Sequence, residues 1–133
     1  MAREFEPTNT IEIMLQQAVA GSLSLDEFLA VLVKCDLYMP CTNEPDGDMS
    51  KFQPLIFDKK GASMAAAFTN MSLMNIYKDL IKGSLAINAG QLLARSAPGF
   101  GIVINPGYRL GLEIDEHGIK GIVSDFVASK QNA

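Results

Sequence analysis

The sequence has no tryptophan, one histidine and two cysteines among its 133 residues. The single histidine, His117, leaves too few imidazoles for a histidine-rich metal site. No apolar run approaches the roughly 20 residues that cross a bilayer, and the charged segment 1–7 does not have the pattern of a secretory signal. An apolar fraction of 48% is enough for a packed core. We therefore expect one globular domain in the cytoplasm, with no membrane partner.

The two cysteines predict no chemistry by their spacing. Five residues separate Cys35 from Cys41, which matches neither the cysteine pairs of a zinc ribbon nor a C-x-x-C redox motif. We interpret both as small apolar packing groups, and a cysteine-dependent enzyme is the least favoured alternative. His117 is predicted to be exposed in the first turn of the last helix, and no G-x-S-x-G motif is present. The sequence thus predicts no enzyme.

The net charge of −4 and the pI near 4.9 argue against nucleic acid as a partner. The charge is uneven along the chain, since residues 1–48 carry −7, residues 49–110 carry +5 and residues 111–133 carry −2. One interpretation is a bipolar surface suited to self-association or to a charged partner. The simpler interpretation is that these blocks interleave in the fold and the asymmetry disappears.

The local motifs that resemble cofactor sites are incomplete. The acidic loop 43–48 fits a calcium loop only in part, because Gln53 stands where a bidentate glutamate is needed, and its Asp46-Gly47 pair predicts a hairpin turn instead. Gly99-Phe100-Gly101 lacks the third glycine of a dinucleotide-binding fingerprint and precedes a strand. We expect no metal and no cofactor.

Apolar residues at helical spacing predict helices that begin at capping residues. Asn9 and Ser24 are each followed three residues later by glutamate, which is the spacing of a capping box. Gly21 makes the connection between these two helices short, so they are predicted to form an αα-hairpin. The apolar positions of the predicted helices span residues 11–19, 25–33, 73–81, 89–94 and 119–127, and Asn70 and Asp115 are the predicted starts of the third and the last.

Strand-like runs occupy residues 36–41, 53–57, 63–68, 84–87, 101–104 and 108–114. Asn105-Pro106-Gly107 joins the last two and predicts a type II turn, because proline presets φ at the second position and glycine supplies the positive φ of the third. We predict an α+β fold in which an N-terminal αα-hairpin is followed by a mostly antiparallel or mixed β-sheet with inserted short helices and a C-terminal helix. The single domain spans 1–133, with a core of about 8–128 and frayed tails at 1–7 and 129–133.

These elements and their order resemble the N-terminal domain of the bacterial SseB family, named for enhanced serine sensitivity, over residues 8–128. The residues that carry the resemblance are Leu37-Tyr38-Met39-Pro40, Phe68-Thr69, the helix from Asn88 to Leu93 and the Ile104-Asn105-Pro106-Gly107 turn. Many members have Thr-Ser-Pro where this chain has Thr69-Asn70-Met71, and a tryptophan where it has Tyr77. The resemblance implies an α+β fold and a cytoplasmic bacterial protein, and it brings no reaction and no catalytic residues. The secreted translocon protein that shares the name is unrelated.

We expect a non-catalytic domain that acts through protein–protein contacts, with an unidentified partner protein or a second copy of the chain. The alternative is a regulatory domain that binds a small ligand, such as an amino acid or an anion. Backbone N–H groups at a turn and at a helix start would favour an anion. The predicted ligand or partner site is the groove between that turn and that helix start, formed by Phe68, Thr69, Asn105, Pro106, Gly107 and Arg109.

Overall fold

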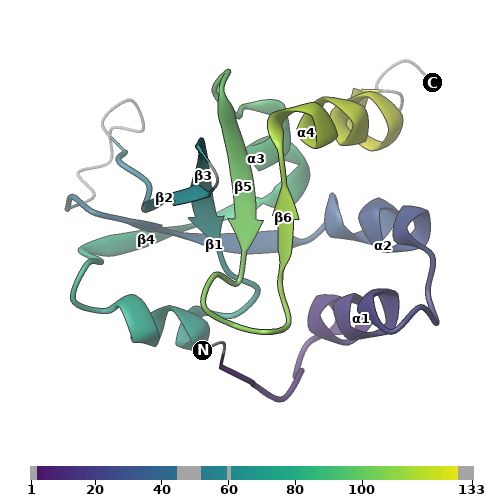
Figure 1. Cartoon of the computed structure of the whole chain (residues 1–133), viewed down its shortest axis with the longest axis horizontal. Helices are drawn as coiled ribbons and strands as arrows, with labels where there is room; N and C mark the ends of the chain where they lie inside the picture. Colours follow the sequence, from purple (N-terminus) through teal and green to yellow (C-terminus); the bar gives the residue numbers. More distant parts are fainter. Residues whose placement is uncertain (1–2, 45–51, 60, 129–133) are drawn as a thin grey trace.

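The computed structural model describes residues 3–44, 52–59 and 61–128, and Figure 1 shows the order of the elements. They are α1 (Thr10–Val19), α2 (Leu25–Leu32), β1 (Asp36–Cys41), β2 (Ile56–Lys59), β3 (Ala62–Ala67), the 3-10 helix η2 (Met71–Tyr77), β4 (Gly83–Asn88), α3 (Ala89–Ala94), β5 (Phe100–Ile104), β6 (Leu112–Ile114), α4 (Glu116–Ile122) and the π-helical η3 (Val123–Ala128). The predicted α+β fold is confirmed. The turn predicted at Asp46-Gly47 and the predicted frayed tail 129–133 lie outside the described residues.

Side-chain caps set the starts of the first two helices. Asn9 Oδ1 accepts from Glu12 N at 2.9 Å, and Glu12 Oε1 accepts from Asn9 N at 3.4 Å, which completes the predicted capping box. Ser24 caps α2 by accepting from Glu27 N. Gly21 adopts a left-handed φ of +83° in the connection between the helices, so the predicted αα-hairpin is confirmed. No helix in the described ranges has the length and apolar character needed to cross a membrane.

The strands form two sheets. β1 and β4 make an antiparallel pair, and the second sheet has the order β2-β3-β5-β6, in which β3 and β5 are parallel and the other pairs are antiparallel. Tyr38 of β1 and Phe68 after β3 exchange two main-chain hydrogen bonds of 2.9 and 2.8 Å. β1 therefore has β4 on one side and the second sheet on the other.

The segment before β2 joins the two sheets. We predicted a strand over 53–57, but β2 begins only at Ile56, and the prediction is wrong for its first three residues. Pro54 forms an isolated bridge to Cys41, Leu55 N donates to Pro40 O at 3.1 Å, and Leu55 O accepts from the N–H of β3 at Ala66 at 2.9 Å. Residues 54–55 thus bridge β1 and β3 and do not belong to β2.

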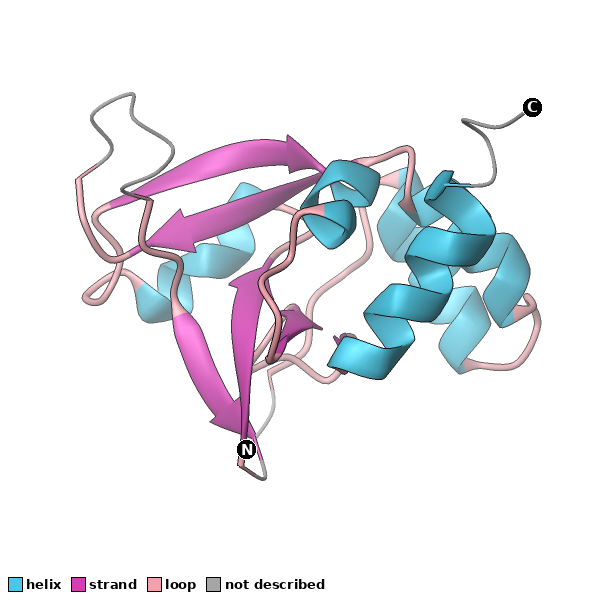
Figure 2. Ribbon diagram, turned by 90° about the horizontal axis from the view of Figure 1, so that it is seen from above, coloured by secondary structure: helices cyan, strands magenta, loops and turns pink. Residues whose placement is uncertain are grey.

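Two apolar clusters lie on the two faces of β3 and β5. Successive side chains of a strand point to opposite faces. Ala66 and Val103 belong to the smaller cluster, which η2 covers, whereas Ala67 and Ile102 belong to the larger one. Helices α1, α2 and α4 contribute to the larger cluster and gather at one end of the molecule (Figures 1 and 2). The strands are therefore buried from both sides over their central residues.

The third predicted helix, 73–81, is wrong in type and in its end. The structure has a 3-10 helix that ends at Tyr77, with Asn70 capping it through a bond from Ser72 N to its Oδ1. After Tyr77 the chain turns back, and Lys82 N donates to Cys41 O at 2.9 Å immediately before β4. The last four residues of the predicted helix, 78–81, therefore form the turn that leads from η2 into β4.

The predicted type II turn after β5 is confirmed, and the strand after it is shorter than predicted. Tyr108 N donates to Asn105 O at 3.1 Å, and Gly107 has a φ of +87°. β6 begins only at Leu112, opposite Ile104, so the predicted strand 108–114 is wrong for its first four residues. A seven-residue connection takes the place of a tight hairpin.

The N-terminal segment 3–7, for which we predicted fraying, lies against this connection. Arg3 N donates to Gly107 O at 2.9 Å, and Arg109 N donates to Arg3 O at 2.8 Å. The ring of Phe5 meets that of Tyr108 edge-on, with centroids 5.4 Å apart. The main chain of residues 107–109 is thereby paired with the N-terminal segment and not with β5.

Candidate functional site

The six predicted site residues divide into a buried group and an exposed group. Phe68, Thr69, Asn105 and Pro106 are buried, whereas Gly107 and Arg109 are exposed. The predicted proximity of the turn after β5 to the start of η2 is present in the structure. Thr69 N donates to Asn105 Oδ1 at 3.0 Å, and Asn105 Nδ2 donates to Thr69 Oγ1 at 3.1 Å.

A third side chain, Glu12 of α1, completes this buried cluster and was not among the predicted site residues. Its side chain is fully buried, and Thr69 Oγ1 donates to its Oε2 at 2.7 Å. Thr8 N donates to Glu12 Oε1 at 2.9 Å. The capping-box spacing identifies Glu12 as a helix-start residue, but it does not reveal that its second oxygen bonds a residue far along the chain.

The cluster of Glu12, Thr69 and Asn105 is satisfied by its own members. The N–H of Thr69, which we predicted to be available to an anion, already donates to Asn105. The amide of Asn105 also donates to Leu110 O at 3.2 Å, which holds the residue in a left-handed conformation with φ of +58°. An anion would have to displace these bonds next to a carboxyl group. The arrangement therefore fits a connection between α1, η2 and β5 better than a ligand site.

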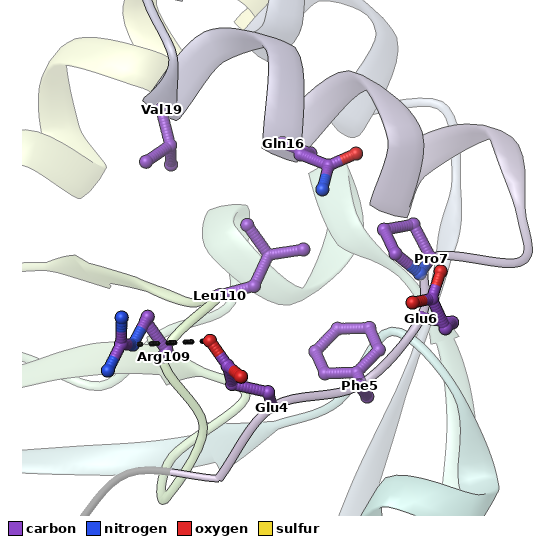
Figure 3. Close-up of a pocket in the computed structure, with 8 residues that line it drawn as sticks. All are labelled: Glu4, Phe5, Glu6, Pro7, Gln16, Val19, Arg109 and Leu110. Atoms are coloured by element: carbon purple, nitrogen blue, oxygen red, sulfur yellow. Dashed lines mark ion pairs between the residues drawn. The ribbon is translucent and has the colours of Figure 1, made fainter.

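Arg109 lies apart from that cluster, in a groove between α1 and the N-terminal segment (Figure 3). The groove has a volume of about 540 Å³. Arg109 Nε lies 3.7 Å from Glu4 Oε1, and both side chains are 74% exposed. Exposed pairs of this kind contribute little, because water screens the charges. The Arg109 groove is lined by Glu4, Phe5, Glu6, Pro7, Gln16, Val19, Arg109 and Leu110.

A second groove, larger and more apolar, lies between the β1–β4 pair and the second sheet. We call it the apolar groove, and its volume is about 610 Å³. Arg95, Gln53 and Ser96 are its polar lining residues, and Ser96 Oγ already donates to Leu92 O at 3.0 Å. Prominent among its apolar lining residues are Met39, Ala65, Leu85, Ile87, Leu92 and Ile102.

The outer edge of β4 borders the apolar groove. The main-chain groups of Tyr38 and Pro40 on β1 form hydrogen bonds on the side away from β4. The alternate residues Leu37, Met39 and Cys41 therefore direct their main-chain groups toward β4. Opposite them on β4 stand Gly83, Leu85 and Ile87. The intervening residues Ser84 and Ala86 therefore point their N–H and C=O groups outward, where they have no main-chain partner among the described residues. Figure 2 shows the β1–β4 pair along one side of the molecule.

Sequence reasoning missed both the apolar groove and the open edge. The alternation of Leu85 and Ile87 indicates a strand with one apolar face, but the sequence does not tell which strand lies beside it. That β4 pairs only with β1 follows from the tertiary arrangement. The groove likewise needs Ala65 and Ile102 from a different sheet.

The thiols and the imidazole lie apart from both grooves. Cys41 is buried and its Sγ lies 3.1 Å from Asn43 O, while Cys35 is half-buried, as the packing interpretation predicts. Burial raises the pKa of the Cys35 thiol, and the neighbouring Asp36 carboxyl raises it further. His117 is exposed. In the described part of the chain, no three His, Cys, Asp or Glu side chains stand close enough to hold one metal ion.

A comparison with protein-family models matches residues 11–120 to the SseB protein N-terminal domain. Comparisons with curated proteins and with solved structures found no match. The match spans the sequence from α1 to α4 and so includes the buried cluster, the apolar groove and β4.

Proposed function

The chain belongs to the family of the SseB protein N-terminal domain, and from that premise we propose that it is a non-catalytic module that binds an extended segment of a partner protein. The segment adds to the outer edge of β4 and places apolar side chains in the apolar groove. One observation carries this proposal, namely that an open strand edge and an apolar groove share the same strand. The side chains of Leu85 and Ile87 line the groove. The alternate residues Ser84 and Ala86 direct their unpaired main-chain groups to the outer edge.

The main chain of β4 supplies the first half of such a site. An extended peptide that adds to a sheet edge gains main-chain hydrogen bonds that do not depend on its sequence. Natural proteins protect edge strands with charged residues, proline or bulges. The β4 sequence, Gly83–Asn88, contains no charged residue and no proline, so its edge is not protected in these ways.

The apolar groove supplies the second half. An added strand places alternate side chains on the face that it shares with Leu85 and Ile87. Those two side chains are half-buried and therefore still have apolar surface to cover. A side chain that goes from full exposure to full burial contributes on the order of 1.5–3 kcal/mol, and the half-buried Leu85 and Ile87 gain a part of that.

The small-ligand alternative is less well supported by this groove. A pocket that selects an amino acid needs several converging polar groups that fix its orientation. Here Arg95 is exposed, Gln53 is exposed, and the Ser96 hydroxyl is used within the chain. Apolar side chains of a protein segment match this lining better than a zwitterion does.

Immobilised ten-residue peptides test the proposal, with apolar and polar residues in alternation and scrambled peptides of the same composition as controls. We expect the alternating peptides to bind the full chain and the scrambled ones to bind at least about tenfold more weakly, since only alternation places apolar side chains on one face. Ala86→Pro should abolish binding by removing an outward N–H, while Ala86→Val, which keeps it, should not. Equal binding of both peptide sets, or full binding by Ala86→Pro, would overturn the proposal.

A matched pair of apolar substitutions tests the groove separately. Leu85→Asn changes a lining residue, and Leu80→Asn changes an exposed leucine outside the groove. We expect Leu85→Asn to weaken peptide binding and Leu80→Asn to leave it unchanged. Urea unfolding of both variants establishes that they fold. If both variants bind peptides as the unmodified chain does, the groove takes no part in binding.

A further inference from the structure

We infer that the strand that pairs with β4 is β4 of a second copy of this chain, in antiparallel orientation about a twofold axis at Leu85. This inference rests on the proposed function and names the partner of that site. It joins the two β1–β4 pairs into one continuous four-stranded sheet.

The free main-chain groups fix the register of such a pair. Lys82 N already donates to Cys41 O at 2.9 Å. Asn88 is the N-cap of α3, and the carbonyl of a capping residue accepts the first bond of its helix. Ser84 and Ala86 remain as the β4 residues with both groups directed outward. A twofold axis at Leu85 places Ser84 of each copy opposite Ala86 of the other, so that all of these groups are paired.

The same register brings apolar side chains together. Residues that form hydrogen-bonded pairs alternate with residues whose side chains approach most closely. Leu85 of one copy therefore lies directly opposite Leu85 of the second copy, on the face that lines the apolar groove. Cross-strand apolar pairs of this kind each add to the stability of a sheet.

Charges at the two ends of β4 are complementary in this register. Lys82, the residue before β4, lies opposite Asn88 of the second copy. Within that second copy, Asn88 of β4 is paired with Asp36 of β1. Two strand spacings, about 10 Å, then separate the main chains of Lys82 and the second copy's Asp36, and a lysine side chain extends over much of that distance. Both residues are exposed. Twofold symmetry repeats the pair, so each dimer contains two such attractions and no matching repulsion between these residues.

Sedimentation velocity over a micromolar to submillimolar concentration series tests the inference on the full chain. We expect a reversible dimer. Ala86→Pro should be monomeric throughout, because an outward N–H is lost and the ring obstructs the edge, while Ala86→Val should dimerise like the unmodified chain. Circular dichroism of Ala86→Pro establishes that it is folded. A chain that stays monomeric at every concentration, or an Ala86→Pro variant that dimerises normally, overturns the inference.

A charge exchange tests the register. Lys82→Glu and Asp36→Lys should each weaken the dimer by about threefold or more, because both symmetric attractions become repulsions. The double variant should recover most of the loss. Additive weakening in the double variant would refute this register. If the chain is monomeric yet alternating peptides bind it and Ala86→Pro prevents this, the inference about the second copy fails while the proposed function stands.

Discussion

Thr69 Oγ1 donates a 2.7 Å hydrogen bond to Glu12 Oε2, although the two residues lie 57 positions apart in the sequence. Both side chains are buried. Glu12 also closes the capping box at Asn9, and Thr69 Oγ1 also accepts from Asn105 Nδ2 in the turn after β5. A single buried hydroxyl thus connects the start of α1, the start of η2 and the end of β5.

Replacing that hydroxyl by a methyl group should destabilise the fold. Thr69→Val keeps the shape of the side chain but leaves Glu12 Oε2 without its donor in a buried site. We expect the free energy of unfolding to fall by about 1–3 kcal/mol, measured by urea unfolding followed by circular dichroism. Thr8→Val removes a 3.2 Å bond to the same carboxyl group from an exposed side chain and should cost less than about 0.5 kcal/mol. Equal losses in the two variants would contradict a stabilising role for the buried bond.

Helix starts were predictable because their signals are local. A capping residue and its partner lie three residues apart, so Asn9 with Glu12 and Asn88 with Gln91 could be recognised from the sequence, and both bonds are present. The type II turn at Pro106-Gly107 was predictable for the same reason. These signals do not fix where an element ends, as η2 illustrates, because the chain turns after Tyr77 and leads into β4 where the sequence pattern predicts four more helical residues.

The candidate site depends on long-range contacts, and the sequence predicted it only in part. Thr69 and Asn105 do lie together, but their polar groups bond one another and Glu12. Arg109, predicted to lie beside them, lines a separate groove with Glu4 because the N-terminal segment pairs with the main chain near it. No local pattern predicts that the polar segment 3–7 forms main-chain hydrogen bonds with residues 107–109.

Gly101 of β5 should resist substitution because the last residue of β6 approaches it closely. A Cβ atom at this position would lie 2.7 Å from Ile114 O and 3.1 Å from Met64 Cε. Since the first atom belongs to the backbone, β5 or β6 would have to move. We expect Gly101→Ala to lower the free energy of unfolding by about 1–3 kcal/mol in a denaturant titration.

Gly121 of α4 supplies the matched control for that substitution. Nothing lies within 4 Å of a Cβ atom added there. Alanine is preferred over glycine in a helix by about 1 kcal/mol, so Gly121→Ala should leave the free energy of unfolding unchanged or raise it. If Gly101→Ala is as well tolerated as Gly121→Ala, the close approach of β5 to Ile114 does not constrain the fold.

Cys35 should react slowly with iodoacetamide because its pKa is raised. Burial disfavours the thiolate, the neighbouring Asp36 carboxyl disfavours it further, and the thiolate is the reacting form. At pH 8 we therefore expect Cys35 to be alkylated more slowly than the cysteine of an unstructured reference peptide. The rate should still rise above pH 9. Mass spectrometry of the proteolytic fragments that contain Cys35 and Cys41 measures each rate. Asp36→Asn should accelerate the reaction, and buried Cys41 should stay unmodified in the folded protein. Faster alkylation of Cys35 than of the peptide would favour an activated thiol, and with it the cysteine-dependent enzyme.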